Sequence, residues 1–195
     1  MSMETSARTH SIMDAVLPRT GLLRDATLVV GLSLVTALCA QISFWIGPVP
    51  ITGQTFAVLL AAALLGSRLG ALSQLTYLAI GATGLPYWFA LGGPPGIARL
   101  LGPTGGYLWG FVAAAFVVGW LVEHGWGRRL WTAALAMLAG SIVIYIFGLS
   151  WLAHFLPSGE LLPIGLYPFI PGDLIKIALA ALALKSGWVL AQKFG

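Results

Sequence analysis

Asp173 and Lys176 place an acid and a base three residues apart in an otherwise apolar run, YPFIPGDLIKIALAALAL at 167–184. Pro171 and Gly172, just before the acid, are typical of a helix start, so both charged side chains are expected on one face of the first turns. An ionisable group in a membrane helix costs free energy and usually has a functional or pairing role. Two interpretations stay open: a local ion pair favoured by the helix dipole, or a cavity lining in which Asp173 accepts ligand hydrogen bonds and Lys176 attracts an anion.

Other polar and aromatic side chains could belong to the same cavity. Arg99, in a Gly- and Pro-rich stretch, either extends to lipid phosphates or offers its planar fork to a carboxylate. Tyr87 and Tyr107 flank it in sequence and form either an interfacial aromatic belt or a cover for an apolar ligand. Thr52 and Gln54 either cap a helix or bind the ligand. Such a cavity suits a small amphipathic ligand with an anionic group and N–H groups.

The sequence contains none of the common catalytic patterns, GxxxxGK[ST], HExxH or GxSxG. Asp173 is the only acid within an apolar stretch, so the paired carboxylates of an intramembrane aspartyl protease are missing. The histidines His10, His124 and His154 and the single cysteine, Cys39, lack metal-ligand spacing. We therefore expect no catalytic site, no metal and no cofactor, and a membrane enzyme is the weaker alternative.

The composition indicates the elements that hold these side chains. The chain is 58% hydrophobic and 8% charged, whereas a soluble domain is about a quarter charged. Its 195 residues suffice for about six membrane crossings. We expect a cytoplasmic leader at 1–25 and a membrane domain at 26–195. The net charge of +4 does not indicate nucleic-acid binding, because the basic residues are dispersed at the ends of apolar stretches.

Charge placement predicts the topology. The apolar stretches are 26–44, 54–65, 69–80, 106–122, 130–152 and 171–190. If 54–80 forms two short helices rather than one broken crossing, the basic residues of the leader, the inner connections and the C-terminal end fall on one side, and the outer connections hold only Arg99. Those assigned to the cytoplasmic side are Arg8, Arg19, Arg24, Arg68, Arg128, Arg129, Lys185 and Lys193. This favours an all-α protein of six transmembrane helices in the cell membrane, with both termini cytoplasmic.

The same topology places three connections outside, at 45–53, 82–105 and 153–170. They are rich in Gly, Pro and aromatic residues, whereas the inner turns are short and basic. Elaborate loops usually carry function, so the outer face is expected to bind the ligand.

Three segments occur in an informative order: PVPITGQT at 48–55 followed by VLLAAALLGSRLGALSQLTYLAIGATGLPYWF, then GPTGGYLWGF at 102–111, then GLYPFIPGDLIK at 165–176. In this order they resemble the signatures of the biotin-binding S-component of energy-coupling factor (ECF) transporters, the BioY family, from about residue 26 to the end. The resemblance implies a membrane subunit that captures biotin outside. Import would then depend on a separate transmembrane coupling protein and ATP-hydrolysing subunits, which is consistent with the missing phosphate loop.

The resemblance also implies roles for single residues. Asp173 and Lys176 match the family's Asp-x-x-Lys and would contact the ureido group of the biotin ring. Arg99 lies where the family has a basic residue and would bind the valerate carboxylate. The remaining candidate contacts are Thr52, Gln54, Tyr107 and Tyr87.

S-components of this kind meet their coupling protein through small residues of the first helix. Here the sequence has small residues four apart, and the candidates for that contact are Gly31, Ser33, Ala37 and Ala40. Ordinary packing inside the bundle is the open alternative.

A different functional class also stays open, namely a stand-alone carrier driven by an ion gradient. Such a carrier would normally show internal repeats and broken midplane helices, which the sequence does not indicate.

Overall fold

The structure, a computed structural model, describes residues 21–194, so most of the expected leader, with Arg8 and Arg19, lies outside the described residues. Within them the chain is mostly helical. The longer helices are α2 (Gly21–Ala40), α3 (Gln54–Leu65), α4 (Ser67–Ala82), α6 (Gly105–Leu121), α7 (Leu130–Leu152) and α9 (Ile170–Phe194). The shorter elements are β1 (Ser43–Ile46), β2 (Val49–Thr52), α5 (Ile97–Leu101), the π-helical turn η1 (Val122–Trp126) and α8 (Leu161–Gly165).

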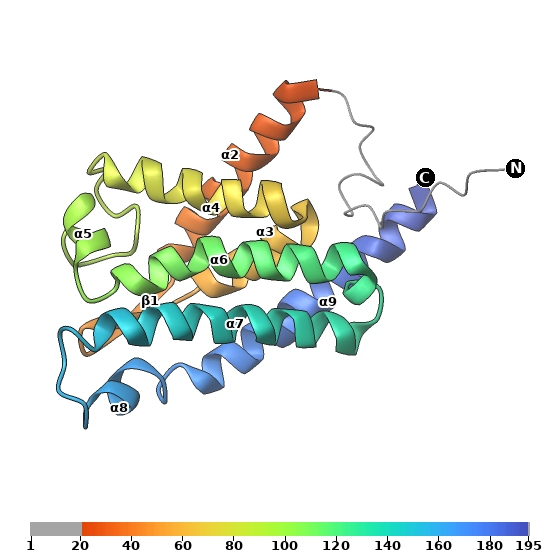
Figure 1. Cartoon of the computed structure of the whole chain (residues 1–195). Helices are drawn as coiled ribbons and strands as arrows, with labels where there is room; N and C mark the ends of the chain where they lie inside the picture. Colours follow the sequence, from red (N-terminus) through yellow and green to blue (C-terminus); the bar gives the residue numbers. More distant parts are fainter. Residues whose placement is uncertain (1–20, 195) are drawn as a thin grey trace, which may run out of the picture.

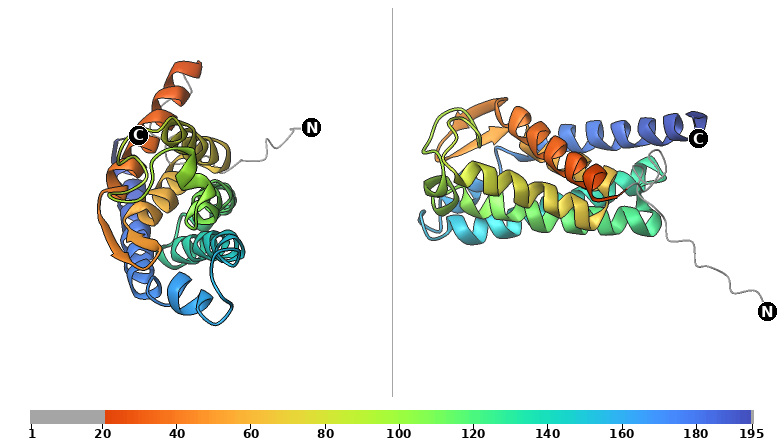
Figure 2. Two further views of the ribbon diagram at one scale, coloured as in Figure 1. Left: turned by 90° about the vertical axis from the view of Figure 1, so that its left-hand side faces the viewer. Right: turned by 90° about the horizontal axis from the view of Figure 1, so that it is seen from above.

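The longer helices form one bundle (Figure 1). Helix α6 packs against α7, α4 and α3, and α9 packs against α3 and α7. Helix α2 contacts α3 and α4 but leans diagonally across the bundle (Figure 2). The β-strands, α5 and α8 gather at one end of the bundle, and the beginning of α2, η1 and the end of α9 lie toward the other.

The outer surface of the bundle is apolar. Leu38, Ile146 and Ile175 are 69%, 58% and 62% exposed, as expected for side chains that face lipid rather than water. In the part of the chain that the structure describes, four segments are long and apolar enough to cross a membrane: Gly21–Ala40, Gly105–Trp126, Leu130–Leu152 and Leu161–Val189. The chain is therefore a multi-pass membrane protein. Helices α3 and α4 are shorter, with 12 and 16 residues.

Residues 54–80 form two helices rather than one. Gly66, the single residue between α3 and α4, has φ +82°, a conformation that strains side chains with a Cβ. The two helices fold back on each other so closely that a Cβ on Gly70 would lie 2.9 Å from the Cα atom of Ala62.

A short β-hairpin follows α2 where the sequence predicted only an irregular connection in an all-α chain. Strand β1 pairs antiparallel with β2, from Ser43 opposite Thr52 to Ile46 opposite Val49, and Gly47 in the turn has φ +81°. Aromatic and β-branched residues on both sides of Gly47-Pro48 favour this pairing. The two strands supply each other's backbone hydrogen bonds at the end of the bundle.

At the other end, Glu123 of η1 joins two helix connections. Its carboxylate accepts hydrogen bonds from the Ser67 backbone N–H at 2.7 Å and from the Ser67 hydroxyl at 2.9 Å. The N–H groups in the first turn of α4 have no partner within the helix, and a carboxylate there also interacts favourably with the helix dipole. Glu123 therefore caps α4 from a distant part of the chain.

Replacing Glu123 with Ala is expected to lower the thermal stability of the detergent-purified chain. Loss of a capping group costs about 1–2 kcal/mol, which corresponds to a decrease in Tm of about 2–8 °C for a chain of this size. The measurement is thermal unfolding followed by circular dichroism. Glu160→Ala, at an exposed acid without a side-chain capping bond, is the matched control. Equal Tm values for the two variants would contradict the capping role.

Candidate substrate-binding site

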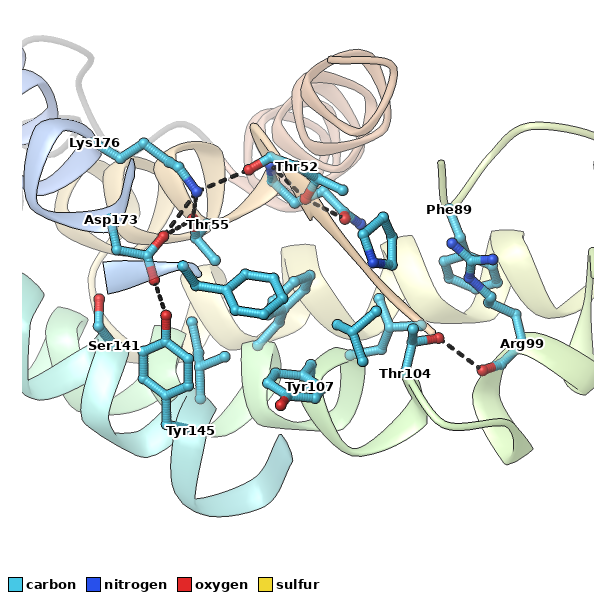
Figure 3. Close-up of a pocket in the computed structure, with 17 residues that line it drawn as sticks. Thr52, Thr55, Phe89, Arg99, Thr104, Tyr107, Ser141, Tyr145, Asp173 and Lys176 are labelled. Carbon is cyan, nitrogen blue, oxygen red and sulfur yellow. Dashed lines mark hydrogen bonds and ion pairs between the residues drawn. The ribbon is translucent and has the colours of Figure 1, made fainter. Parts of the chain in front are cut away.

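A cavity of about 580 Å³, including its open mouth, lies at the end of the bundle that carries the hairpin. Residues of β2, α3, α5, α6, α7 and α9 line it. Its lining is largely apolar and aromatic and includes Phe111, Ile144 and Phe169, with Tyr107 near its middle (Figure 3). Its polar groups separate toward two ends, with Asp173 and Lys176 at one and Arg99 at the other (Figure 3).

The first polar end is built around Asp173, which is 7% exposed. Lys176 donates to its Oδ1 atom at 2.7 Å. Thr55 donates to the same oxygen at 3.2 Å, and Tyr145 donates to Oδ2. Helix α9 begins at Ile170, so the acid lies in the first turn, as the Pro-Gly pair predicted, where the positive end of the helix dipole stabilises a carboxylate.

Lys176 has all three N–H groups engaged by the protein. Its Nζ donates to Asp173 Oδ1, to the backbone carbonyl of Thr52 at 2.9 Å and to the Thr55 hydroxyl at 2.9 Å. Since an ammonium has three donors, this set is complete. Lys176 therefore ties the hairpin and α3 to the start of α9 and holds the Asp173 carboxylate in place.

Two residues at this end, Thr55 and Tyr145, were not predicted from the sequence. Thr55 directly follows the candidate Gln54 in the first turn of α3, so a helical extension of that motif could have indicated it. Tyr145 lies within the apolar run of α7, where its aromatic ring gives no sign that its hydroxyl meets a carboxylate 28 residues away.

Arg99 forms the second polar end. It is 4% exposed, which contradicts the interpretation that it extends to lipid phosphates. Its Nη1 donates to the Gly92 carbonyl at 3.1 Å, and its guanidinium lies over the Trp45 ring, 5.1 Å from the centroid. No acid among the described residues forms an ion pair with it.

The charge of this group persists in its buried position. Burial lowers the pKa of the Arg99 guanidinium, but arginine starts from so high a value that it stays a cation at neutral pH. Among the described residues, only one of its five N–H donors has a hydrogen-bond partner. A carboxylate entering the cavity would supply the missing counter-charge.

Between the two ends, Thr52 and Gln54 form a satisfied network rather than free contacts. The Thr52 hydroxyl donates to Gln54 Oε1 at 2.7 Å, and Gln54 Nε2 donates to the Tyr77 hydroxyl at 2.7 Å. Tyr77 is fully buried and donates to the Trp88 carbonyl at 3.2 Å. This chain of bonds links β2, α3 and α4 to the connection that begins after α4, and sequence reasoning missed Tyr77.

The two predicted tyrosines have different positions. Tyr107 lines the cavity, stacks on Phe169 with ring centroids 6.4 Å apart and donates to the Gly165 carbonyl at 2.8 Å. Tyr87 does not line this cavity: it has φ +61° and its side chain is 64% exposed. Phe89, two residues later, lines the cavity, whereas a contact of Tyr87 with a ligand stays a prediction that this position does not support.

The small residues of the first helix mostly face inward. Ser33, Ala37 and Ala40 are buried in this chain. These three residues therefore pack within the bundle, which is the alternative that the sequence left open. Gly31 differs, since a Cβ at that position would meet nothing within 4 Å.

Nothing in this arrangement resembles a site for bond-breaking chemistry. Among residues 21–194, no group of three His, Cys, Asp or Glu side chains could hold a metal ion. The cavity instead has a carboxylate, an aromatic middle and a buried cation, which is a binding arrangement. A multi-pass bundle with such a cavity at one end defines a membrane solute-binding protein.

Comparison with known proteins identifies the family. The model of the BioY family matches residues 5–193, and this chain belongs to that family, which confirms the resemblance seen in the three sequence segments. A probable biotin transporter BioY of Pyrococcus horikoshii is 42% identical over 159 residues, covering 82% of this chain and 93% of the relative. A biotin transporter BioY of Thermotoga maritima is 41% identical over 145 residues, covering 73% and 83%.

A solved structure gives the same result. The crystal structure of the S-component for biotin from an ECF-type ABC transporter matches this chain with a TM-score of 0.75 and 28% sequence identity. The match covers 84% of this chain and 90% of that one.

Proposed function

We propose that this chain is the substrate-capturing S-component of an ECF-type importer and that its ligand is biotin. The observation that carries the proposal is the cavity itself, with Asp173 and Arg99 at opposite ends of an aromatic middle. Its relatives are named biotin transporters, not enzymes, and the matching solved structure is an S-component for biotin.

The two polar groups of biotin match the two polar ends of this cavity. The valerate carboxylate binds the Arg99 guanidinium, which lacks an acidic partner among the described residues. The ureido ring donates an N–H group to Asp173, whose two oxygens accept three hydrogen bonds from described residues and retain acceptor capacity. The apolar part of the ligand packs against Tyr107 and Phe169. Lys176, Thr52 and Gln54 keep the walls in position.

In this proposal the chain crosses the cell membrane six times, with the cavity at the outer face and both termini in the cytoplasm. The proposal is supported by the basic residues of two connections, Arg68 after Gly66 and Arg128 and Arg129 after η1, because inner connections carry an excess of Lys and Arg. Glu123 joins these two connections at the end away from the hairpin.

Import requires a separate transmembrane coupling protein and ATP-hydrolysing subunits, since this chain has no phosphate-binding loop. We propose that the coupling protein meets the open side of α2, where Gly31 permits close approach of a second backbone. Ser33, Ala37 and Ala40 support this helix from within.

Calorimetry with biotin on the detergent-purified chain alone tests the proposed function. We expect about one ligand per chain and saturable binding without any partner subunit, because both polar ends of the cavity come from this chain. Folded protein that binds no biotin would overturn the assignment. Binding that appears only after the coupling protein is added would show that the chain is not a self-sufficient capture subunit.

A further inference from the structure

Ser141 of α7 lines the cavity near Asp173 and Tyr145 (Figure 3). Its side chain is 4% exposed, and its hydroxyl has no hydrogen-bond partner. A buried hydroxyl without a partner loses free energy relative to water. A ligand group that pairs with it would recover that loss on binding.

Most other buried hydroxyls among the described residues have a partner; the Ser43 hydroxyl also lacks one, but Ser43 does not line the cavity. Within their own helices, Ser33 donates to the Val30 carbonyl, Thr36 to Leu32 and Ser73 to Gly70, at 2.7, 3.0 and 2.8 Å. This return to the preceding turn is the usual solution for a helical Ser or Thr. The hydroxyls of the other buried residues Ser67, Thr104, Tyr77 and Tyr107 also have partners. Ser141 lies in a helix as Ser33, Thr36 and Ser73 do, but it differs from them because it lines the cavity and its hydroxyl has no partner.

The polar neighbours of Ser141 have no donor left for a ligand. Lys176 uses its three N–H groups on Thr52, Thr55 and Asp173. The hydroxyl of Tyr145 donates to Asp173, and that of Thr55 does the same. At this end the protein therefore presents acceptor capacity on Asp173 and one unengaged donor, the hydroxyl of Ser141.

We propose that the Ser141 hydroxyl donates a hydrogen bond to the carbonyl oxygen of the ligand's ureido ring. The inference rests on the proposed function, because it assumes that biotin enters with its ring at the Asp173 end. In a cyclic urea each N–H group is bonded to the carbonyl carbon. A ring that donates N–H to Asp173 therefore holds its carbonyl oxygen close by, where a second, donating group is needed. Asp173 and Ser141 together recognise the ring, since one accepts from its N–H group and the other donates to its C=O group.

The test is calorimetry on wild type, Ser141→Ala and Ser150→Ala with two probes, biotin and biotinamide, in which a neutral amide replaces the carboxylate. Ala retains the helix, and Ser150, exposed on the same helix, is the matched control. We expect Ser141→Ala to weaken biotin binding about 3- to 10-fold, the usual effect of one neutral hydrogen bond. Biotinamide binding should weaken by the same factor, since the ring is unchanged, while Ser150→Ala leaves both affinities at the wild-type value.

The outcomes separate this inference from the proposed function. If wild type does not bind biotin, the proposed function fails. If wild type binds and Ser141→Ala binds equally well, only the role of Ser141 is refuted. A loss seen with biotin but not with biotinamide would assign Ser141 to the carboxylate end and also refute the inference. Circular dichroism and gel filtration of each variant establish that the affinities belong to folded protein.

Discussion

Asp173→Asn is expected to weaken biotin binding by about 10- to 100-fold. The carboxylate accepts from Lys176, Thr55 and Tyr145 and is proposed to accept an N–H group of the ligand. An amide has one oxygen instead of two, and its NH₂ group would face donors that need an acceptor. Hydrogen bonds to a charged group contribute about 1.5–3 kcal/mol each, and each 1.4 kcal/mol is about tenfold in affinity. The loss of the one such bond to the ligand gives the expected factor, measured by calorimetry.

A second variant separates binding from folding. Asp173→Asn alone leaves the Lys176 ammonium without its carboxylate, and an unpaired buried charge destabilises the protein. The double variant Asp173→Asn with Lys176→Met removes both charges. If the loss of binding came only from the unpaired ammonium, the double variant would regain affinity. If Asp173 binds the ligand, the double variant stays as weak as Asp173→Asn.

Lys176→Met alone should also weaken binding, because the carboxylate then loses the ammonium that holds it 2.7 Å away. Wild-type affinity in Asp173→Asn would remove Asp173 from the site. Wild-type affinity in Lys176→Met would leave Lys176 as a structural ion pair only.

The sequence was sufficient to predict the residues that carry charge in the cavity. Asp173, Lys176 and Arg99 are conspicuous because a charged side chain in a membrane segment costs free energy and usually has a functional or pairing role. The helix start at Pro171-Gly172 was equally predictable, since proline has a fixed φ and lacks the N–H group that the first turn leaves unpaired. These are local signals, and the structure brings all three charged residues to one cavity.

Neutral residues of the site were not predictable in the same way. Tyr145, Ser141 and Tyr77 lie in apolar helices, where a single hydroxyl is compatible with packing, back-bonding or a ligand. Which of these applies depends on the helix that packs opposite, as for Tyr145 and Asp173 across α7 and α9. For Tyr87, sequence proximity to other aromatics did not reveal the positive φ and the exposed position outside the cavity lining.

The hairpin was missed for a related reason. Pro48 and Pro50 argue against a strand, because proline lacks the N–H group of a β-ladder. In a hairpin of two strands the outer edges need no such group, and Pro50 pairs opposite Trp45. The consequence for the site is direct, because β2 supplies the Thr52 carbonyl that fixes Lys176.

Arg99→Gln is expected to reduce the affinity for biotin by about 10- to 100-fold, the value of a charge-assisted pair in a desolvated site. The guanidinium is buried and is engaged by the Gly92 carbonyl and the Trp45 ring. Glutamine keeps a donor but has neither the charge nor the fork that matches a carboxylate. Arg99→Lys, which restores charge without the fork, should bind with intermediate affinity, and Arg128→Gln, an exposed arginine elsewhere, should bind normally.

Biotinamide decides whether Arg99 acts on the carboxylate or on the shape of the cavity. If Arg99 binds the carboxylate, biotinamide binds wild type and Arg99→Gln with nearly equal affinity, because the charge that Arg99 recognises is already absent. If Arg99 instead only supports the connection through Gly92 and Trp45, Arg99→Gln weakens both ligands by the same factor. Equal losses of affinity for the two ligands would show that another cation binds the carboxylate and that Arg99 is a positioning residue.

Increasing the salt concentration should leave the biotin affinity of wild type largely unchanged, since a buried ion pair is screened much less than an exposed one.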